Sequence, residues 1–312
     1  MRSVLFGASL ALLAACGSTN PFMTAGSGDP ATGDTSDIPD SLRGDLSRFS
    51  YSAASQTLTV EGVTLDNLPF NTIYARNAAL DVPGYQAYTA QNDPLDRHST
   101  AFVMQSGNSG SVRAGVVVTG GQFNRYFGGT YYERDGGYTP PTVTPTSGLV
   151  SYAGNYAGLT NVSGDGGDLL PVPLGTDPSL IPRQSAEVTG QIFLNVDFAD
   201  GSVNGAIYNR TLVDAALALP DIALIATDIA IDGTFHGTTV EYVGLVGTDI
   251  GDYGGIFGGP DAEAVGGGVR LEEWDGENDA LGFDNEEEYG VFVLDQCGTP
   301  DANAPVCASV NP

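Results

Sequence analysis

The sequence of 312 residues contains no lysine, so all eleven of its basic residues are arginines. A chain without lysine cannot form a Walker A phosphate site, a Schiff base on lysine or an S-x-x-K nucleophile. Acidic residues number 38 and the formal net charge is −27. Such a surface repels nucleic acid and anionic headgroups, so nucleic acid is excluded as an expected partner. It suits a saline habitat, a basic partner or cation-linked binding.

Histidine is also scarce, because His98 and His236 are the only two. A hydrolase acting at neutral pH needs a nucleophile beside a base, and imidazole is the usual base. No G-x-S-x-G motif surrounds any serine. We therefore expect both histidines to be hydrogen-bonded strand residues, and we predict no catalytic residue, no cofactor and no enzymatic activity.

Cysteine occurs three times, and the first stands in a distinctive context. Arg2 precedes a short apolar run over residues 4–15, and Leu13-Ala14-Ala15 leads directly into Cys16. The pattern resembles a bacterial lipobox, in which the cysteine is lipidated and becomes the first residue after cleavage; a secretory peptide cut at an A-x-A site is the alternative. We expect residues 1–15 to be a signal peptide. We expect Cys16 to carry the lipid that holds the chain at the outer membrane, on the cell surface.

Cys297 and Cys307 remain as a pair once Cys16 is assigned to lipid. The nine residues between them include two prolines and can fold back on themselves. Outside the cytoplasm, two such cysteines favour a disulfide, and neither histidine is near them in sequence to suggest a metal site. We expect the disulfide to fasten a C-terminal tail, residues 298–312.

Composition divides the remaining chain into three parts. Residues 16–44 are rich in Gly, Ser, Thr, Asp and Pro, which is typical of a disordered tether. Residues 45–146 contain period-two segments, beginning with a hairpin around "AASQ", and predict a small antiparallel β domain. The prolines of "YTPPTVTPTSG" interrupt strand pairing and mark its end. Residues 147–297 form the third part.

Apolar and polar residues alternate more strictly in residues 147–297 than in residues 45–146. "TGQIFLNVDF" places Ile192, Leu194 and Val196 on one face, and Asp200-Gly201 could supply a type I′ turn into "VNGAIYN". "DIALIATDIAID" alternates in the same way, with Ile225 and Ile231 on its apolar face. Eight strands joined in order predict an all-β fold, an eight-stranded antiparallel up-and-down barrel preceded by the smaller β domain.

The glycine-rich stretch 254–274, "GGIFGGPDAEAVGGGVRLEEW", could be a ligand loop or part of the barrel. Without lysine and without a strand-to-helix context, a phosphate cradle loses its chemistry. We interpret it as a hairpin that turns at Pro260-Asp261, with glycines where the wall is crowded. We expect the lone tryptophan, Trp274, to pack at the barrel rim.

One acidic cluster offers a candidate metal site. Its carboxylates fall at positions 1, 3, 5 and 12 of a frame like that of the EF-hand loop, namely Asp275, Glu277, Asp279 and Glu286. The glycine that the loop requires at position 6 is Ala280, and no flanking helices are predicted. A solvated acidic turn is therefore the favoured interpretation, and no metal is assigned.

The order of motifs from about 148 to 295 is that of a known group. "SYAGNYAG", "VDFADGSVNGAIYN", "IDGTFHGT" and "GGIFGGPDAEAVGGGVRL" resemble the C-terminal barrel of transferrin-binding protein B-like surface lipoproteins, which include the factor H binding protein. Gly258 shifts the spacing of the last motif. The N-terminal β domain matches the family's handle domain only in position and class.

The resemblance implies a surface binding protein whose barrel supports loops that contact a partner. No residue matches a transferrin-contacting motif, so the ligand-binding residues stay unknown and the ligand is not carried over. We expect an extracellular protein or solute ligand, with a role in iron, haem or solute uptake beside an outer-membrane transporter. A structural envelope lipoprotein without a small ligand is the alternative.

Overall fold

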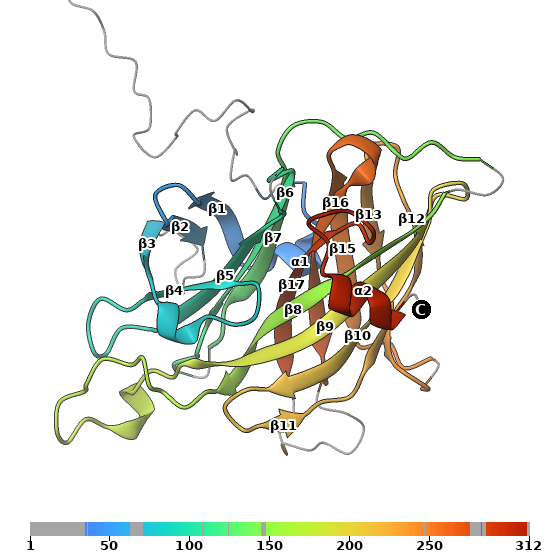
Figure 1. Ribbon diagram of the computed structural model, residues 1–312. Coiled ribbons are helices and arrows are strands. Elements are labelled where there is room, and N and C mark those ends of the chain that lie inside the picture. Colours follow the sequence, from blue (N-terminus) through green and yellow to red (C-terminus); the bar gives the residue numbers. More distant parts are fainter. Residues whose placement is uncertain are drawn as a thin grey trace, which may run out of the picture.

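The computed structural model describes residues 35, 37–62, 71–107, 109–123, 125–144, 148–245, 247–274, 282 and 285–310. Two antiparallel sheets make up nearly all of this structure (Figure 1), so the predicted all-β class is confirmed. The short helices are α1 (Asp40–Arg43), η1 (Ala78–Leu80), η2 (Pro178–Leu180), η3 (Pro260–Ala262) and α2 (Ala304–Val310). None of the described helices is long and apolar enough to cross a membrane.

The N-terminal sheet is a meander whose seven strands pair in chain order. It curls until its first and last strands approach each other, and Asp45 N–H donates to the Gly128 carbonyl over 2.9 Å. Phe49 and Tyr131 stack across the same gap, with ring centroids 5.1 Å apart. The strands are β1 (Leu46–Ser52), β2 (Thr57–Gly62), β3 (Asn71–Arg76), β4 (Gln86–Ala90), β5 (Ser99–Gln105), β6 (Val112–Thr119) and β7 (Gly128–Arg134).

The C-terminal sheet closes into the predicted up-and-down barrel. Its strands are β8 (Leu149–Ser163), β9 (Ser185–Asp197), β10 (Ser202–Leu212), β11 (Leu217–Ala218), β12 (Ile222–Asp228), β13 (Thr234–Gly237), β14 (Val240–Tyr242), β15 (Gly251–Gly258), β16 (Ala264–Glu272) and β17 (Glu287–Asp295). β13 and β14 follow each other along one side of the wall, where β14 pairs with β12 and β13 with β15. Counted as one strand, and with the two-residue β11 set aside, they complete a ring of eight.

Three groups of buried side chains hold the molecule together. One fills the barrel, and it contains the inward face of β9 that the sequence predicts, Ile192, Leu194 and Val196. A second joins the N-terminal sheet to the outside of the barrel, where Val291 and Val293 of β17 pack among the residues of β5 and β6. The third is small and places Val306 of α2 against the outer wall. The barrel wall is therefore packed against other side chains on both its inner and its outer face.

The folded part begins before residue 45, which corrects the end of the predicted tether. Leu42 in α1 is fully buried, and its carbonyl accepts a hydrogen bond from Thr130 Oγ1 over 2.9 Å. α1 also contacts β15 and β16, so it lies between the two sheets. An apolar leucine in a polar segment was the available signal. Residues 1–34, including Cys16, lie outside the described residues.

Two local predictions in the barrel are wrong. The β9–β10 turn is not type I′, because Gly201 has a positive φ of 66° and Asp200 does not; instead, Asp197 Oδ1 accepts the N–H groups of Ala199 and Asp200. Ile225 is 39% exposed, because Ile222 and Leu224 are the core-facing residues of β12 and a register shift in the β10–β12 pairing follows them. Ile231 is fully exposed because it lies beyond the end of β12, in the turn before β13.

The glycine-rich stretch forms the predicted hairpin. β15 and β16 are joined by η3, in which Asp261 has a φ of 53°. A Cβ atom at Gly267 would collide with the Gly254 carbonyl and the Phe292 ring. Trp274 is fully buried, as expected. The glycines thus allow backbone and aromatic rings to approach closely inside the wall.

Candidate binding surfaces

The barrel interior is occupied by packed side chains and by one ionic network. Arg210 and Glu288 are both fully buried, and Arg210 Nη2 donates to Glu288 Oε2 over 2.6 Å. Tyr156 donates its hydroxyl to the other carboxylate oxygen over 2.6 Å, and Arg210 Nη1 donates to the carbonyls of Pro220 and Trp274. Because the described interior is filled in this way, the candidate binding surfaces lie on the outside of the barrel.

His236 lies in β13, as expected of a strand residue, whereas His98 is the last loop residue before β5. His98 is fully buried, with its Nε2 atom 2.8 Å from Asp168 Oδ2. His236 lies with its Nε2 atom 3.7 Å from Asp252 Oδ1. Neither imidazole ring is hydrogen-bonded to a described serine, threonine or cysteine side chain, and Thr227 Oγ1 donates to the backbone carbonyl of His236. The geometry contains no pairing of nucleophile and base at these positions.

Three loops meet beside the lower end of the N-terminal sheet in Figure 1 and form what we call the three-loop surface. They are residues 91–98 between β4 and β5, residues 120–127 between β6 and β7, and residues 164–184 between β8 and β9. They expose large apolar side chains to between 37% and 105%, namely Leu95, Phe123, Leu170, Leu174 and Leu180. Exposed apolar side chains gathered in one region are typical of contact sites.

Hydrogen bonds fix the three loops to one another. Gln122 Nε2 donates to the carbonyls of Leu95 and Leu180, each over 2.8 Å, and so joins all three. Arg183 N–H donates to the Gly121 carbonyl over 3.1 Å. Asp168 accepts from Asn77 Nδ2 over 2.7 Å, in addition to its contact with His98. The apolar side chains are therefore presented by a preorganised backbone.

The same loops hold three arginines without a carboxylate partner among the described residues: Arg97, Arg125 and Arg183. Arg125 and Arg183 are exposed. Arg97 stacks its guanidinium 4.7 Å above the centre of the Phe127 ring, and burial lowers its pKa. Six of the other described arginines form ion pairs. In a chain of net charge −27, a group of unpaired arginines is a distinct electrostatic feature.

An acidic group lies beneath the start of the third loop. Glu187 of β9 is 4% exposed, although its position in the strand faces outward. Burial, and then the negative charges of Asp214 and Asp165, raise its pKa to about 7. Asp165 N–H donates to Asp214 Oδ2 over 2.9 Å, which keeps the two carboxylates near each other. Within the described residues no group of three His, Cys, Asp or Glu side chains is arranged to hold a metal.

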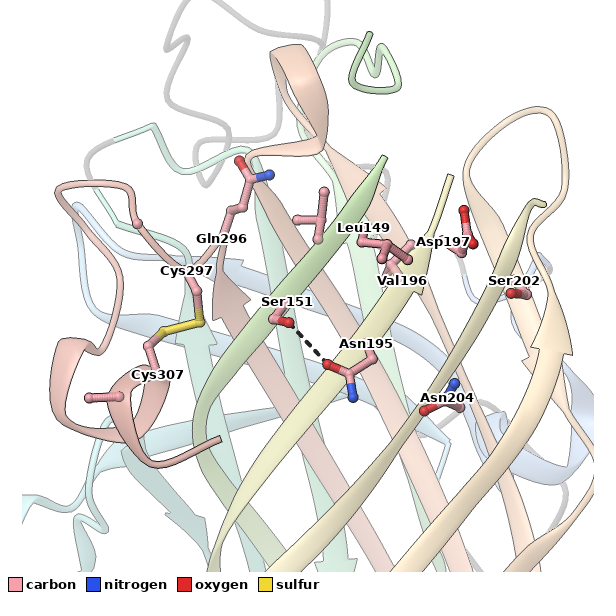
Figure 2. A pocket seen from close by; sticks show the side chains of 13 residues that line it. Leu149, Ser151, Asn195, Val196, Asp197, Ser202, Asn204, Gln296, Cys297 and Cys307 are labelled. Carbon is pink, nitrogen blue, oxygen red and sulfur yellow. Dashed lines mark hydrogen bonds between the residues drawn. A yellow bond between two sulfur atoms is a disulfide. The ribbon is translucent and has the colours of Figure 1, made fainter. Parts of the chain in front are cut away.

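A second surface is a groove of about 970 Å³ on the outer wall of the barrel (Figure 2). Its floor is made by the outward residues at adjoining ends of β8, β9 and β10, among them Ser151, Asn195 and Asn204. Ser151 Oγ donates to Asn195 Oδ1 over 3.0 Å, the dashed line of Figure 2. The disulfide between Cys297 and Cys307 forms one side of the groove.

The structure bears on few of the sequence-predicted site residues. The Sγ atoms of Cys297 and Cys307 are bonded at 2.03 Å. Of the weak calcium candidates, Asp275, Glu277 and Asp279 lie outside the described residues, while Glu286 is buried. Cys16 lies outside them as well.

Sequence reasoning missed both surfaces. The three-loop surface unites segments whose members are up to about 90 residues apart, and "LLPVPLGTDPSLIP" in residues 169–182 was the one local signal, an apolar run too rich in proline for a strand. The groove depends on strand register, since Asn195 and Asn204 read individually as ordinary outward polar residues.

Comparison with known proteins gives matches in structure and none in sequence. No protein-family model and no curated protein sequence matches the chain. A transferrin binding protein B double mutant from Haemophilus parasuis Hp5 is 12% identical at a TM-score of 0.38, over 80% of this chain and 54% of that chain. A single mutant of that protein is 12% identical at a TM-score of 0.34, over 80% and 53%.

The isotype 1 protein from serogroup B Neisseria meningitidis is 14% identical at a TM-score of 0.35, over 86% of this chain and 56% of that one. This chain spans about half the length of each of these structures. All three of these solved structures are of transferrin binding protein B, the group whose barrel motifs residues 148–295 resemble.

Proposed function

We propose that the chain is a lipid-anchored outer-membrane protein that binds an extracellular protein partner through its three-loop surface. The observation that carries the proposal is the cluster of exposed apolar side chains on hydrogen-bonded loops, above all Phe123 at 55% exposure. The apolar side chains of such a surface stay in unfavourable contact with water until a partner covers them. The filled barrel supports the proposal, because it leaves the outer surfaces, these loops among them, for contact with a partner.

A protein partner fits this surface better than a membrane does. The first loop exposes Asp93 and Asp96 beside Leu95, and the third exposes Asp177 beside Leu180. Anionic headgroups would repel these carboxylates. A protein surface can present apolar groups together with charges of both signs, which is the mixture that these loops display.

The anchor is part of the same proposal. Lipidation at Cys16 would attach the chain to the membrane ahead of α1, with acyl chains contributing about 0.8 kcal/mol per buried CH₂. A role in the uptake of iron, haem or another solute, beside an outer-membrane transporter, would follow if the partner were a carrier of that solute. Substitution Cys16→Ser should move the protein from the membrane fraction to the soluble fraction, and protease treatment of intact cells should degrade the wild type.

Site-specific photo-crosslinking tests the contact surface. A photoreactive phenylalanine analogue at position 123, in the full chain on living cells, should give an adduct with another protein. The same analogue at Ile73 is the matched control, because Ile73 is 66% exposed on β3 of the same sheet but stands outside the three loops. Equal labelling from the two positions, or adducts with lipid alone from position 123, would reject the protein-binding surface. Such a result would favour the structural envelope lipoprotein.

A further inference from the structure

We infer that the groove on the outer wall of β8, β9 and β10 is a binding site for a neutral, hydroxyl-rich ligand, that is, a segment of glycan. It lies beside the first residues of β8, whereas the 164–184 loop follows the last, so the groove and the three-loop surface occupy opposite ends of a strand of 15 residues. This inference is independent of the proposed protein partner.

Strand register determines which side chains form the floor. Ser151 pairs with Asn195, and Asn195 pairs with Asn204, so the three side chains form one row across three strands. Paired residues project from the same face of a sheet, with Cβ atoms about 4.5–5.5 Å apart. Figure 2 shows the row along the open side of the wall. Two amides and a hydroxyl therefore stand side by side on the outer wall.

The next row explains why the groove ends where it does. Ala153, Phe193 and Ala206 pair in the same way, two residues farther along each strand. This row is apolar, and α2 covers part of it: Val306 and Cys307 pack with Ala153 and Phe193. The helix thus covers part of the apolar row, and the polar row remains open to solvent beside it.

The floor has hydrogen-bonding capacity to spare. The Ser151 hydroxyl occupies Asn195 Oδ1, but no described residue hydrogen-bonds to Asn195 Nδ2 or to either polar atom of the Asn204 amide. Both asparagines are exposed. Each free amide can donate and accept at once, which matches the hydroxyl group of a sugar, itself a donor and an acceptor.

The charge of the groove selects against ionic ligands. Its described lining contains no arginine and no histidine, so an anion would find no counter-charge. Its one carboxylate, Asp197, already accepts two backbone N–H groups with Oδ1 in the β9–β10 turn. The lining is also too polar for a purely apolar ligand, because amides and hydroxyls would be buried without partners. A neutral polyhydroxylated ligand satisfies all of these conditions.

The side wall is rigid. Cys297 N–H donates to the Ser151 carbonyl over 2.8 Å, and the disulfide ties α2 to that point. Tyr208 Oη lies 3.3 Å from Ser309 Oγ, which holds the C-terminal part of the helix to β10. A wall fixed at two points keeps the groove open, so little ordering is required when a ligand binds.

A glycan array and a matched set of variants test the inference. The full chain should bind neutral glycans, and the double variant N195A/N204A should bind them roughly tenfold more weakly or not at all, because two recognition groups are lost. Q191A is the control, since Gln191 faces outward on the same strand, four residues from Asn195. It should retain binding within about twofold.

Side-chain amide resonances provide a second measurement. In ¹⁵N-labelled protein, the neutral glycan that gives the strongest array signal should shift the NH₂ signals of Asn195 and Asn204, and should leave that of Gln191 in place. No signal on any neutral glycan would overturn the inference, as would signals confined to sialylated or sulfated glycans. So would equal binding by N195A/N204A and the wild type. None of these outcomes affects crosslinking at Phe123, so the proposed function is tested separately.

Discussion

The substitution Arg210→Met should destabilise the barrel more than any surface change. Arg210 and Glu288 are both fully buried, and the arginine contributes hydrogen bonds of 2.6, 3.0 and 3.2 Å to Glu288, Pro220 and Trp274. Without it, the Glu288 carboxylate is left in the core with the Tyr156 hydroxyl as its remaining side-chain partner. Removing one member of a buried ion pair costs about 3–5 kcal/mol.

The loss is measured as a shift of the barrel's thermal unfolding midpoint. A change of about 3–5 kcal/mol corresponds to roughly 6–20 °C for a domain of 150–250 residues. The double variant R210M/E288Q should recover part of this loss, since glutamine removes the buried charge and still accepts the Tyr156 hydroxyl. Arg48→Met is the control: its exposed ion pair with Glu61 spans 3.8 Å and is worth about 0–1 kcal/mol. If R210M/E288Q is as unstable as R210M, the buried-charge reasoning is wrong.

Three further predictions concern stability. The raised pKa of Glu187 means that the native state binds its proton more tightly than the unfolded chain does, so the free energy of unfolding should fall as pH rises from about 4.5 through about 7. The E187Q variant should lack this fall, and at pH 8 its free energy of unfolding, measured by urea titration, should exceed that of the wild type by about 1–3 kcal/mol. Gly267→Ala should lower stability by about 1–3 kcal/mol because of its clash, whereas Gly137→Ala, with nothing within 4 Å, should leave the melting midpoint unchanged. Reducing the disulfide, which closes a loop with a sequence separation of 10, should lower the opening free energy of α2 by about 2–3 kcal/mol, seen as faster amide exchange over Ala304–Val310. Unchanged exchange there would show that α2 is held by packing alone.

The barrel could be predicted because its information is local. Alternation in β9 set Ile192, Leu194 and Val196 on the inner face, and no bulge interrupts that strand between them. The glycine hairpin was recognisable for a similar reason, since closely spaced glycines beside Pro260 left few other interpretations. The alternation of apolar residues and the choice of turn residues are properties of short segments, and in these two segments the structure agrees with them.

Where tertiary pairing adds a residue, the same reasoning failed. The register shift beside Ile225 depends on how β12 meets β10, which no property of β12 alone reveals. The β9–β10 turn failed because Asp197 satisfies the turn's N–H groups with its side chain. The unpaired arginines of the three-loop surface were equally hidden, because a missing carboxylate partner is visible only once distant loops are brought together.

The position of α1 has a mechanical consequence. Thr35 Oγ1 donates to the carbonyls of Leu46 and Ser47, and Leu42 is wedged beside Gly254 and under β7. Tension transmitted along the N-terminal segment would thus enter the fold at the seam of its two sheets, first at the Thr35 bonds and then at the buried leucine. Load would therefore reach β1 of the N-terminal sheet first, and the contact of Leu42 with β7 and β15 next.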